Sequence, residues 1–241
     1  TLALPSWLRS GRPAVDPLSV AALFAYMALF AFAYLTLSAG TGALLLFGAV
    51  QMTMIFAAMR SGERFRPVAW VGLALAVTGL VYLVAPGVTS PDPLGAALMA
   101  GAGVAWGVYS LRGRGVGNPL SATTNNFLFC IPLCLVVSLL FMDQWQLTAK
   151  GAVWAVLSGA VASGLGYVVW YAALKGLSAG SAATVQLSVP VIAALGGVVL
   201  LNEPLTLRIV LSSVAVLGGI ALVLNQRQRL NDRLKAVLNR D

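Results

Sequence analysis

The sequence predicts an all-α integral membrane protein with eight transmembrane helices, and three observations support this prediction. Hydrophobic residues make up 59% of the 241 residues and charged residues only 9%, whereas soluble domains carry about 25% charged residues. Eight apolar segments each approach the roughly 20 residues that a bilayer span requires. The basic residues lie between these segments and are concentrated in alternate connections.

The predicted helices are joined by short connections, which leave no room for a soluble domain. Helices joined in this way lie antiparallel to their neighbours. In chain order the segments are Leu18–Leu37, Thr41–Met59, Pro67–Ala85, Leu94–Leu111, Ser121–Phe141, Gly151–Leu174, Ser181–Leu201 and Thr206–Asn225. Glycines in these segments are predicted to allow close contact between helices. They are Gly101, Gly103, Gly107, Gly159, Gly164, Gly166, Gly196, Gly197, Gly218 and Gly219.

The positions of lysine and arginine predict the orientation in the membrane. With eight helices, thirteen of the 15 basic residues fall on the side of the N terminus, and only Lys150 and Arg208 fall on the other side. Because cytoplasmic connections are enriched in these residues, both termini are predicted to be cytoplasmic, with the protein in the cell inner membrane. Residues 1–17 are then a cytoplasmic lead. Residues 226–241 form a basic tail, either an amphipathic helix on the membrane surface or a solvated extension of the last helix.

Composition also excludes several classes of function. The net charge of +8 does not indicate a nucleic-acid-binding protein, because the basic residues separate apolar segments instead of clustering on a polar surface. The chain has no histidine, the commonest metal ligand and general base. Cys130 and Cys134 lie one helical turn apart in an apolar segment and are interpreted as buried small side chains. The sequence therefore predicts no enzyme, no metal and no cofactor.

An internal repeat relates the two halves of the chain. The motif LSAG at Leu37–Gly40 returns 140 residues later, and with the same offset Glu63 corresponds to Glu203 and Gly79 to Gly219. The second predicted helix corresponds to the seventh, and this odd step reverses its direction. Such inverted repeats are typical of secondary transporters, in which two halves of opposite orientation enclose a site near the membrane midplane.

The repeat carries motifs of a known family. Trp106 in AWGVYS, the run VPVIAALGGVVLLNEPLT from Val189, and the pair Gly62 and Glu63 resemble the EamA type of the drug/metabolite transporter superfamily, including the YddG-like amino acid exporters. The resemblance implies a polytopic helix bundle of two inverted five-helix repeats. Residues 94–225 then form a complete second repeat and residues 18–85 an incomplete first repeat with three helices. The sequence is either a truncated or cleaved chain or a naturally short relative. Truncation is favoured, and part of any substrate cavity would then be missing.

Charged groups are confined to the ends of the predicted helices. No Asp, Glu, Lys or Arg lies deep in any of the eight segments, so a proton relay of intramembrane carboxylates is not supported. Glu63 and Glu203 lie at turns at the membrane edge. Each is either a gate charge or proton acceptor, or a helix-end cap or partner of a nearby arginine, and the cap interpretation is favoured.

The polar side chains that lie deep in the predicted helices are amides. Gln51, Gln186, Asn125 and Asn126 lie in apolar segments, where an amide requires a hydrogen-bonding partner. They are predicted to face the bundle interior, either bridging helices or lining a cavity. Pro190, four residues after Gln186, is predicted to kink the seventh helix and to act as a hinge.

Aromatic residues recur in both halves. Tyr167, Trp170 and Tyr171 share one face of the sixth helix, and Trp170 corresponds to Phe30 on the first helix, which also carries Tyr26 and Tyr34. These residues are either packing groups or an interfacial belt, or they line a cavity. The candidate substrate-binding residues are Trp106, Asn125, Trp170, Tyr171, Gln186, Gln51, Phe30 and Tyr34.

Two functions remain open on the sequence alone. The first is a secondary transporter that exports small amphipathic metabolites such as amino acids by alternating access, as the resemblance implies. The alternative is a membrane scaffold or accessory subunit without transport activity. The expected partners are the lipid bilayer and a small-molecule substrate, and no nucleic acid. The sequence does not define an oligomeric state.

Overall fold

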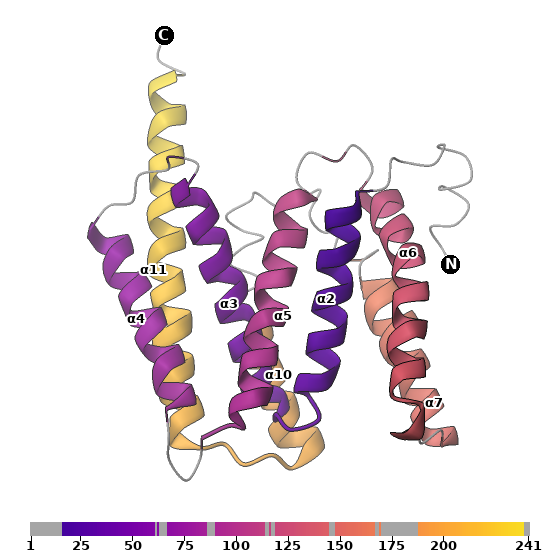
Figure 1. The fold of residues 1–241 in the computed structure, drawn as a ribbon. Helices are drawn as coiled ribbons and strands as arrows, with labels where there is room; N and C mark the ends of the chain where they lie inside the picture. Colours follow the sequence, from indigo (N-terminus) through magenta and orange to yellow (C-terminus); the bar gives the residue numbers. More distant parts are fainter. Residues whose placement is uncertain are drawn as a thin grey trace. The chain divides into compact units, whose positions relative to one another are not determined.

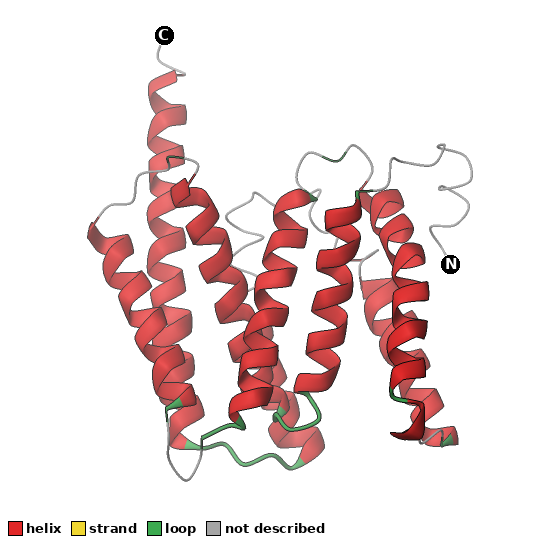
Figure 2. Cartoon of the chain, in the orientation of Figure 1, coloured by secondary structure: helices red, strands yellow, loops and turns green. Residues whose placement is uncertain are grey.

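The structure is a computed structural model that describes residues 16–60, 62, 67–85, 90–113, 116, 119–144, 148–166, 169 and 188–238. These residues form helices and the turns between them, and no strand occurs among them (Figure 2). The described helices are α2 (Pro17–Ala33), α3 (Ala39–Arg60), α4 (Pro67–Val84), α5 (Pro93–Arg112), α6 (Pro119–Leu140), the short η1 (Met142–Gln144), α7 (Ala149–Val156), η2 (Leu157–Leu165), α10 (Ser188–Leu201) and α11 (Leu207–Leu238) (Figure 1).

Each of the eight predicted segments contains one helical segment of the described chain, with the π-helix η2 continuing α7. Proline is the first residue of α2, α4, α5 and α6, where its fixed φ suits the helix and its missing N–H leaves no bond unmade. By length and composition, α3, α5 and the Ser121–Leu140 part of α6 are long and apolar enough to cross a membrane. Five shorter apolar helices accompany them: Pro17–Ala33, Pro67–Leu83, Ala149–Leu165, Ile192–Leu201 and Leu207–Val223.

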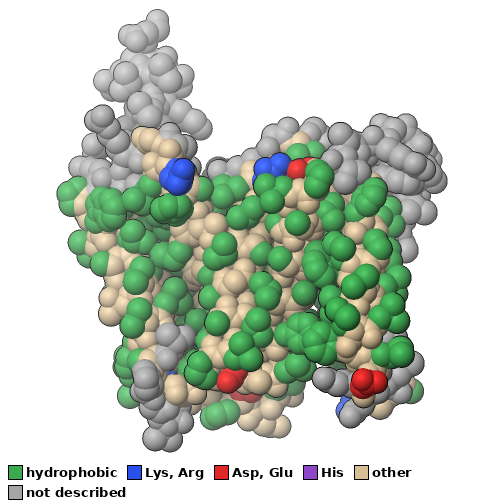
Figure 3. Space-filling model, in the orientation of Figure 1, with side chains coloured by type: hydrophobic (Ala, Val, Ile, Leu, Met, Phe, Trp, Pro, Cys, Tyr) green, Lys and Arg blue, Asp and Glu red, His purple; other side chains and the backbone are tan. Residues whose placement is uncertain are grey.

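The surface agrees with a membrane environment. On the face drawn in Figure 3, hydrophobic side chains cover the helices between their ends, and the coloured charged side chains lie near helix ends. Large hydrophobic side chains are exposed on α4, α6 and α10, among them Val71, Leu139 and Leu200. In water such a surface would indicate an interaction site, whereas in a bilayer it is the surface that lipid tails cover. The protein is therefore an all-α, multi-pass membrane helix bundle.

The chain divides into two compact units, which are described separately. Unit 1 comprises Thr1–Ala25 and Tyr109–Leu177, and unit 2 comprises Tyr26–Val108 and Ser178–Asp241. Helices α2 and α5 contribute residues to both. The larger hydrophobic core lies in unit 2, where α2, α3, α4, α5 and α11 meet. Its buried members are Ala33, Leu37, Leu44, Leu45, Leu46, Ala76, Leu83, Ala96, Met99, Ala102, Val216 and Ile220.

Helices α4 and α11 of unit 2 approach each other closely at glycine. A Cβ atom at Gly219 would lie 2.3 Å from the carbonyl oxygen of Gly72, and one at Gly72 would lie 2.5 Å from that of Gly219. This backbone-to-backbone contact is the kind that small residues allow in membrane bundles. The packing prediction is likewise confirmed for Gly103, Gly107 and Gly197. For Gly159, Gly166, Gly196 and Gly218, a Cβ would meet no atom of the described residues within 4 Å, so the described part of the chain shows no close contact at these four positions.

Other local predictions have mixed outcomes. Cys130 is buried, as predicted, but Cys134 is exposed, as are all six residues of the Ile131–Val136 stretch of α6. Pro132 lies inside α6, a position that the sequence analysis did not single out. Pro190 lies in the first turn of α10, and the residues before Ser188, which the predicted kink involves, lie outside the described part of the chain. Helix α11 runs without a break to Leu238, so the tail continues the last predicted span.

Candidate substrate-binding site

Four aromatic side chains form a continuous series in unit 2. Tyr26, Phe30 and Tyr34 follow one another at intervals of four residues, so that they lie on one side of α2 and its following turn. Their ring centroids are 5.5 Å apart for Tyr26 and Phe30, and 4.7 Å apart for Phe30 and Tyr34. Trp106 of α5 extends the series, with its ring centroid 4.8 Å from that of Tyr26. The structure thus brings three predicted site residues together through Tyr26.

The series is half-buried, and Tyr26, Phe30 and Tyr34 lie against the core of unit 2. Tyr34 is fixed by the start of α3. Its hydroxyl donates a hydrogen bond to the carbonyl oxygen of Ala39 at 3.4 Å, and its ring occupies the space beside Gly42, where a Cβ would lie 2.5 Å from the ring. Such partly exposed aromatic faces bind apolar groups and, through their quadrupoles, cations.

Gln51 lies on the part of α3 that contacts α5. Its side chain is 5% exposed, which confirms that this amide faces the interior. A Cβ at Gly103 would lie 2.6 Å from Ala49 Cβ, and one at Gly107 would lie 2.8 Å from Thr53 Cβ. Because these contacts lie on either side of Gln51 along α3, the α5 segment that carries Trp106 packs directly on the α3 segment that carries Gln51.

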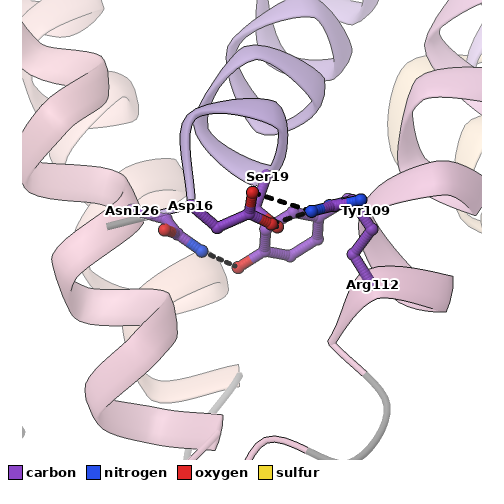
Figure 4. A network of polar contacts seen from close by, with 5 residues as sticks. All are labelled: Asp16, Ser19, Tyr109, Arg112 and Asn126. Atoms are coloured by element: carbon purple, nitrogen blue, oxygen red, sulfur yellow. Dashed lines mark hydrogen bonds and ion pairs between the residues drawn. The ribbon is translucent and has the colours of Figure 1, made fainter. Parts of the chain in front are cut away.

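Unit 1 contains a polar network around Tyr109 of α5. Asn126 of α6 donates from Nδ2 to the Tyr109 hydroxyl at 3.4 Å (Figure 4). This hydroxyl donates to Thr123 Oγ1 at 3.2 Å. Asn125 and Asn126 are 4% and 8% exposed, so the prediction that both amides face the interior is confirmed. Asn126 acts as a bridge between α5 and α6.

A second polar contact in unit 1 joins the start of α2 to the end of α5. Arg112 donates to Asp16 through Nε at 2.7 Å and through Nη2 at 2.8 Å, and the Ser19 hydroxyl donates to the same carboxylate (Figure 4). The hydrogen bonds from Arg112 and then from Ser19 hold the pKa of Asp16 well below its ordinary value. This two-bond geometry fixes the direction of both side chains.

Glu203 caps a helix, as the favoured interpretation predicted. Its Oε1 accepts a hydrogen bond from the Ala39 amide at 2.7 Å, and its Oε2 accepts one from the Gly40 amide at 3.5 Å. The capped helix is α3, whose first N–H groups have no partner within the helix. Arg208 has the complementary role for α4, donating to the carbonyl oxygens of Leu83 and Ala85.

Three candidate site residues, Trp170, Tyr171 and Gln186, lie outside the described residues, and so does Glu63. Among the described residues, sequence reasoning missed the roles of Tyr26 and Tyr109. The spacing of Tyr26, Phe30 and Tyr34 was a usable signal for the first, because a four-residue interval repeated twice defines one helix face. The bridge from Tyr109 to α6 had no signal in the local sequence.

Several known proteins are similar in sequence to this chain. An uncharacterized protein of Pseudomonas aeruginosa is 53% identical over 207 residues, which cover 86% of this chain and 72% of that protein. An uncharacterized transporter of Archaeoglobus fulgidus is 31% identical over 197 residues, covering 79% of this chain and 70% of that protein. The threonine/homoserine exporter RhtA of Salmonella typhimurium is 32% identical over 162 residues, covering 64% of this chain and 54% of that protein.

A solved crystal structure shares the fold, with a TM-score of 0.59 at 20% identity, covering 93% of this chain and 77% of that chain. Residues 93–225, more than half of the chain, match the EamA-like transporter family. The resemblance to EamA-type drug/metabolite transporters is thereby confirmed. The chain belongs to the EamA-like transporter family.

Proposed function

We propose that this membrane transporter exports small amphipathic metabolites, such as amino acids, by alternating access. The observation that carries the proposal is the half-buried series of Tyr26, Phe30, Tyr34 and Trp106 within apolar helices. No charged residue lies deep in the predicted spans. A cavity with aromatic faces and amides, but no fixed charge, suits a substrate whose own charges cancel or a cation held on aromatic rings.

The substrate-binding residues follow from this chemistry. Gln51, Asn125 and Gln186 are assigned to polar groups of the substrate, and Phe30, Tyr34, Trp106, Trp170 and Tyr171 to its apolar part. Similarity to a threonine/homoserine exporter supports amino acids as the first substrates to test. Pro190 is assigned to the bend at which the seventh predicted helix rocks. The first repeat is proposed to be the shorter one, with three helices in residues 18–85.

The proposed orientation places both termini in the cytoplasm of the cell, with the protein in its inner membrane. The thirteen-to-two distribution of lysine and arginine supports it. Cysteines introduced at Ser90 and Arg114 should react with impermeant thiol reagents from opposite sides. Labelling of both positions from one side would contradict the orientation.

The test of function is a flux panel in proteoliposomes with amino acids, nucleosides and cationic drugs. We expect flux of at least one amino acid, and a loss of an order of magnitude or more for Trp170→Ala and Gln186→Leu in protein that still inserts. Parent rates for both variants would show that these residues are packing groups. Absence of flux across the whole panel would favour the scaffold alternative.

A further inference from the structure

The turn between α10 and α11 reaches across unit 2 to the start of α3. Glu203 lies in this turn, and its carboxylate accepts hydrogen bonds from the amides of Ala39 and Gly40, which lie more than 160 residues earlier in the chain. The two hydrogen bonds satisfy N–H groups that have no partner within the helix. A carboxylate is also favoured at this positive end of the helix dipole. One side chain therefore ties the end of one helix to the beginning of another.

The local structure around Glu203 fixes this side chain in place. Asn202 has a φ of 53°, the left-handed conformation in which helices commonly end, and this turns the chain back so that the Glu203 amide donates to the Gly197 carbonyl oxygen at 3.1 Å. The carboxylate then lies over Gly197, where a Cβ would be 2.3 Å from Oε2. The last turns of α10 and the carboxylate thus form one preassembled surface on which α3 rests.

Small residues take part in the contact between α3 and α10. A Cβ at Gly40 would lie 3.1 Å from both Cα and Cβ of Ala194, and a Cβ at Gly197 would lie 3.4 Å from Ala39 Cβ. At these positions no bulky side chain separates the two helix backbones. The hydrogen bonds of Glu203 are the directional part of this contact.

We propose that Glu203 is the latch of a gate at this end of unit 2. Its carboxylate holds α3 against α10 in the state described, and the two helices separate here during the transport cycle proposed above, on which this inference rests. The latch also touches the candidate site, because the Ala39 carbonyl accepts the Tyr34 hydroxyl while the Ala39 amide binds Glu203. Opening of the latch therefore frees Ala39, the residue to which Tyr34 is hydrogen-bonded.

A disulfide lock tests whether the contact must open. Gly40→Cys with Ala194→Cys, in a background with Cys130→Ala and Cys134→Ala, places two thiols on Cβ positions close enough for a disulfide after a small adjustment. We expect oxidation to lower flux at least roughly tenfold and a reductant to restore it. If α3 and α10 must separate in each transport cycle, a disulfide that holds them together prevents nearly all turnover. Equal flux before and after oxidation would overturn the latch.

A labelling experiment decides the same question without transport, so that failure of the proposed function and failure of the latch are distinguished. Thr41 lies in the first turn of α3 and is 6% exposed. In the cysteine-free background, Thr41→Cys should react with a thiol reagent roughly tenfold faster when Glu203→Gln is added, since charged hydrogen bonds stabilise a closed state to about this extent.

The matched control is Arg208→Gln, which removes the other charged contact near the same turn but leaves α3 capped. We expect it to leave the labelling rate of Thr41→Cys unchanged. Equal rates in the parent and Glu203→Gln, or equal acceleration by Arg208→Gln, would show that Glu203 is not a latch for α3.

Discussion

The ring of Trp106 in α5 lies against the ring of Tyr26 in α2, with centroids 4.8 Å apart and planes inclined at 47°. An aromatic pair of this kind contributes about 0.5–1.5 kcal/mol beyond the area that it buries. That is small compared with the apolar core that holds α2, α3 and α5 together. Substrate binding can therefore be separated from folding by substitution at these two positions.

The first prediction concerns Tyr26. Tyr26→Ala should raise the KM for a transported substrate roughly tenfold while the melting temperature changes little, because it removes a half-buried ring of the proposed site. Tyr26→Phe should retain most of the affinity, since the aromatic face remains. Phe56→Ala is the control, because Phe56 lies on α3, is 58% exposed and is not part of the aromatic series. A KM that rises equally for Tyr26→Ala and Phe56→Ala would contradict the assignment.

A second prediction concerns Gly197, over which the Glu203 carboxylate lies. Gly197→Ala should destabilise the protein by about 1–3 kcal/mol, the range for overfilling a packed site, because the methyl group would displace the carboxylate. At the adjacent Gly196 the same change meets no atom of the described residues within 4 Å, so Gly196→Ala should be neutral or slightly stabilising. Thermal unfolding in detergent compares the two variants, and similar melting temperatures would count against the described geometry.

The third prediction uses the same logic on α11. Gly219→Ala should weaken the contact with α4, since its Cβ would lie 2.3 Å from the Gly72 carbonyl oxygen and 2.7 Å from the Ala76 amide nitrogen. These atoms are backbone and cannot move aside without shifting a helix. Gly218→Ala is the matched control with open space. We expect a loss of at least about 1 kcal/mol for the first variant only, measured by chemical or thermal denaturation.

The fourth prediction is a pH dependence at the Asp16–Arg112 ion pair. Because Arg112 and Ser19 depress the pKa of Asp16 in the folded protein, the pair adds stability at every pH above the ordinary carboxyl pKa of about 4 and loses it as the pH falls further. The side chains are 40% and 37% exposed, so the effect is small. Asp16→Asn should therefore lower the melting temperature slightly and equally from pH 5 to pH 8. If the melting-temperature difference between the parent and Asp16→Asn grows from pH 5 to pH 8, the loss of stability does not come from this ion pair.

The helices were predictable because a membrane span is recorded in local composition. Each apolar segment contains a helix, and most described ends lie close to those predicted. The end of the sixth predicted helix and the start of the seventh lie outside the described residues, and the C terminus differs. There the hydropathy falls after Asn225 but α11 continues to Leu238. A helix requires no change of backbone geometry where its surroundings change from apolar to polar. Hydropathy therefore locates the membrane boundary and not the end of the helix.

Burial and hydrogen-bond register were harder to predict. The spacing of Cys130 and Cys134 shows that they share a face of α6, but it does not show whether another helix covers all of that face. The π-helical register of Leu157–Leu165 likewise has no signal in the local sequence. Gln51, Asn125 and Asn126 were correctly placed inside, because an amide in an apolar segment has a strong physical reason to avoid lipid.

The candidate site was predictable in part for the same reason. Phe30, Tyr34 and Trp106 were identified from type and repeat position, and the structure joins them through Tyr26. The partner of Glu203 was not predictable by name, since it lies 164 residues away along the chain. What the sequence supplied was the class of partner, because a carboxylate at a membrane-edge turn has few alternatives to a helix terminus or an arginine.

The turn that carries Glu203, together with Arg208, also has a consequence for biogenesis. The first amides of α3 and the Leu83 carbonyl near the end of α4 are bound by residues that follow them by more than 120 positions. While the ribosome is still making the middle of the protein, neither helix has its charged partner. Water must satisfy these helix ends until the hairpin of α10 and α11 inserts, and only then do both helices gain their charged partners.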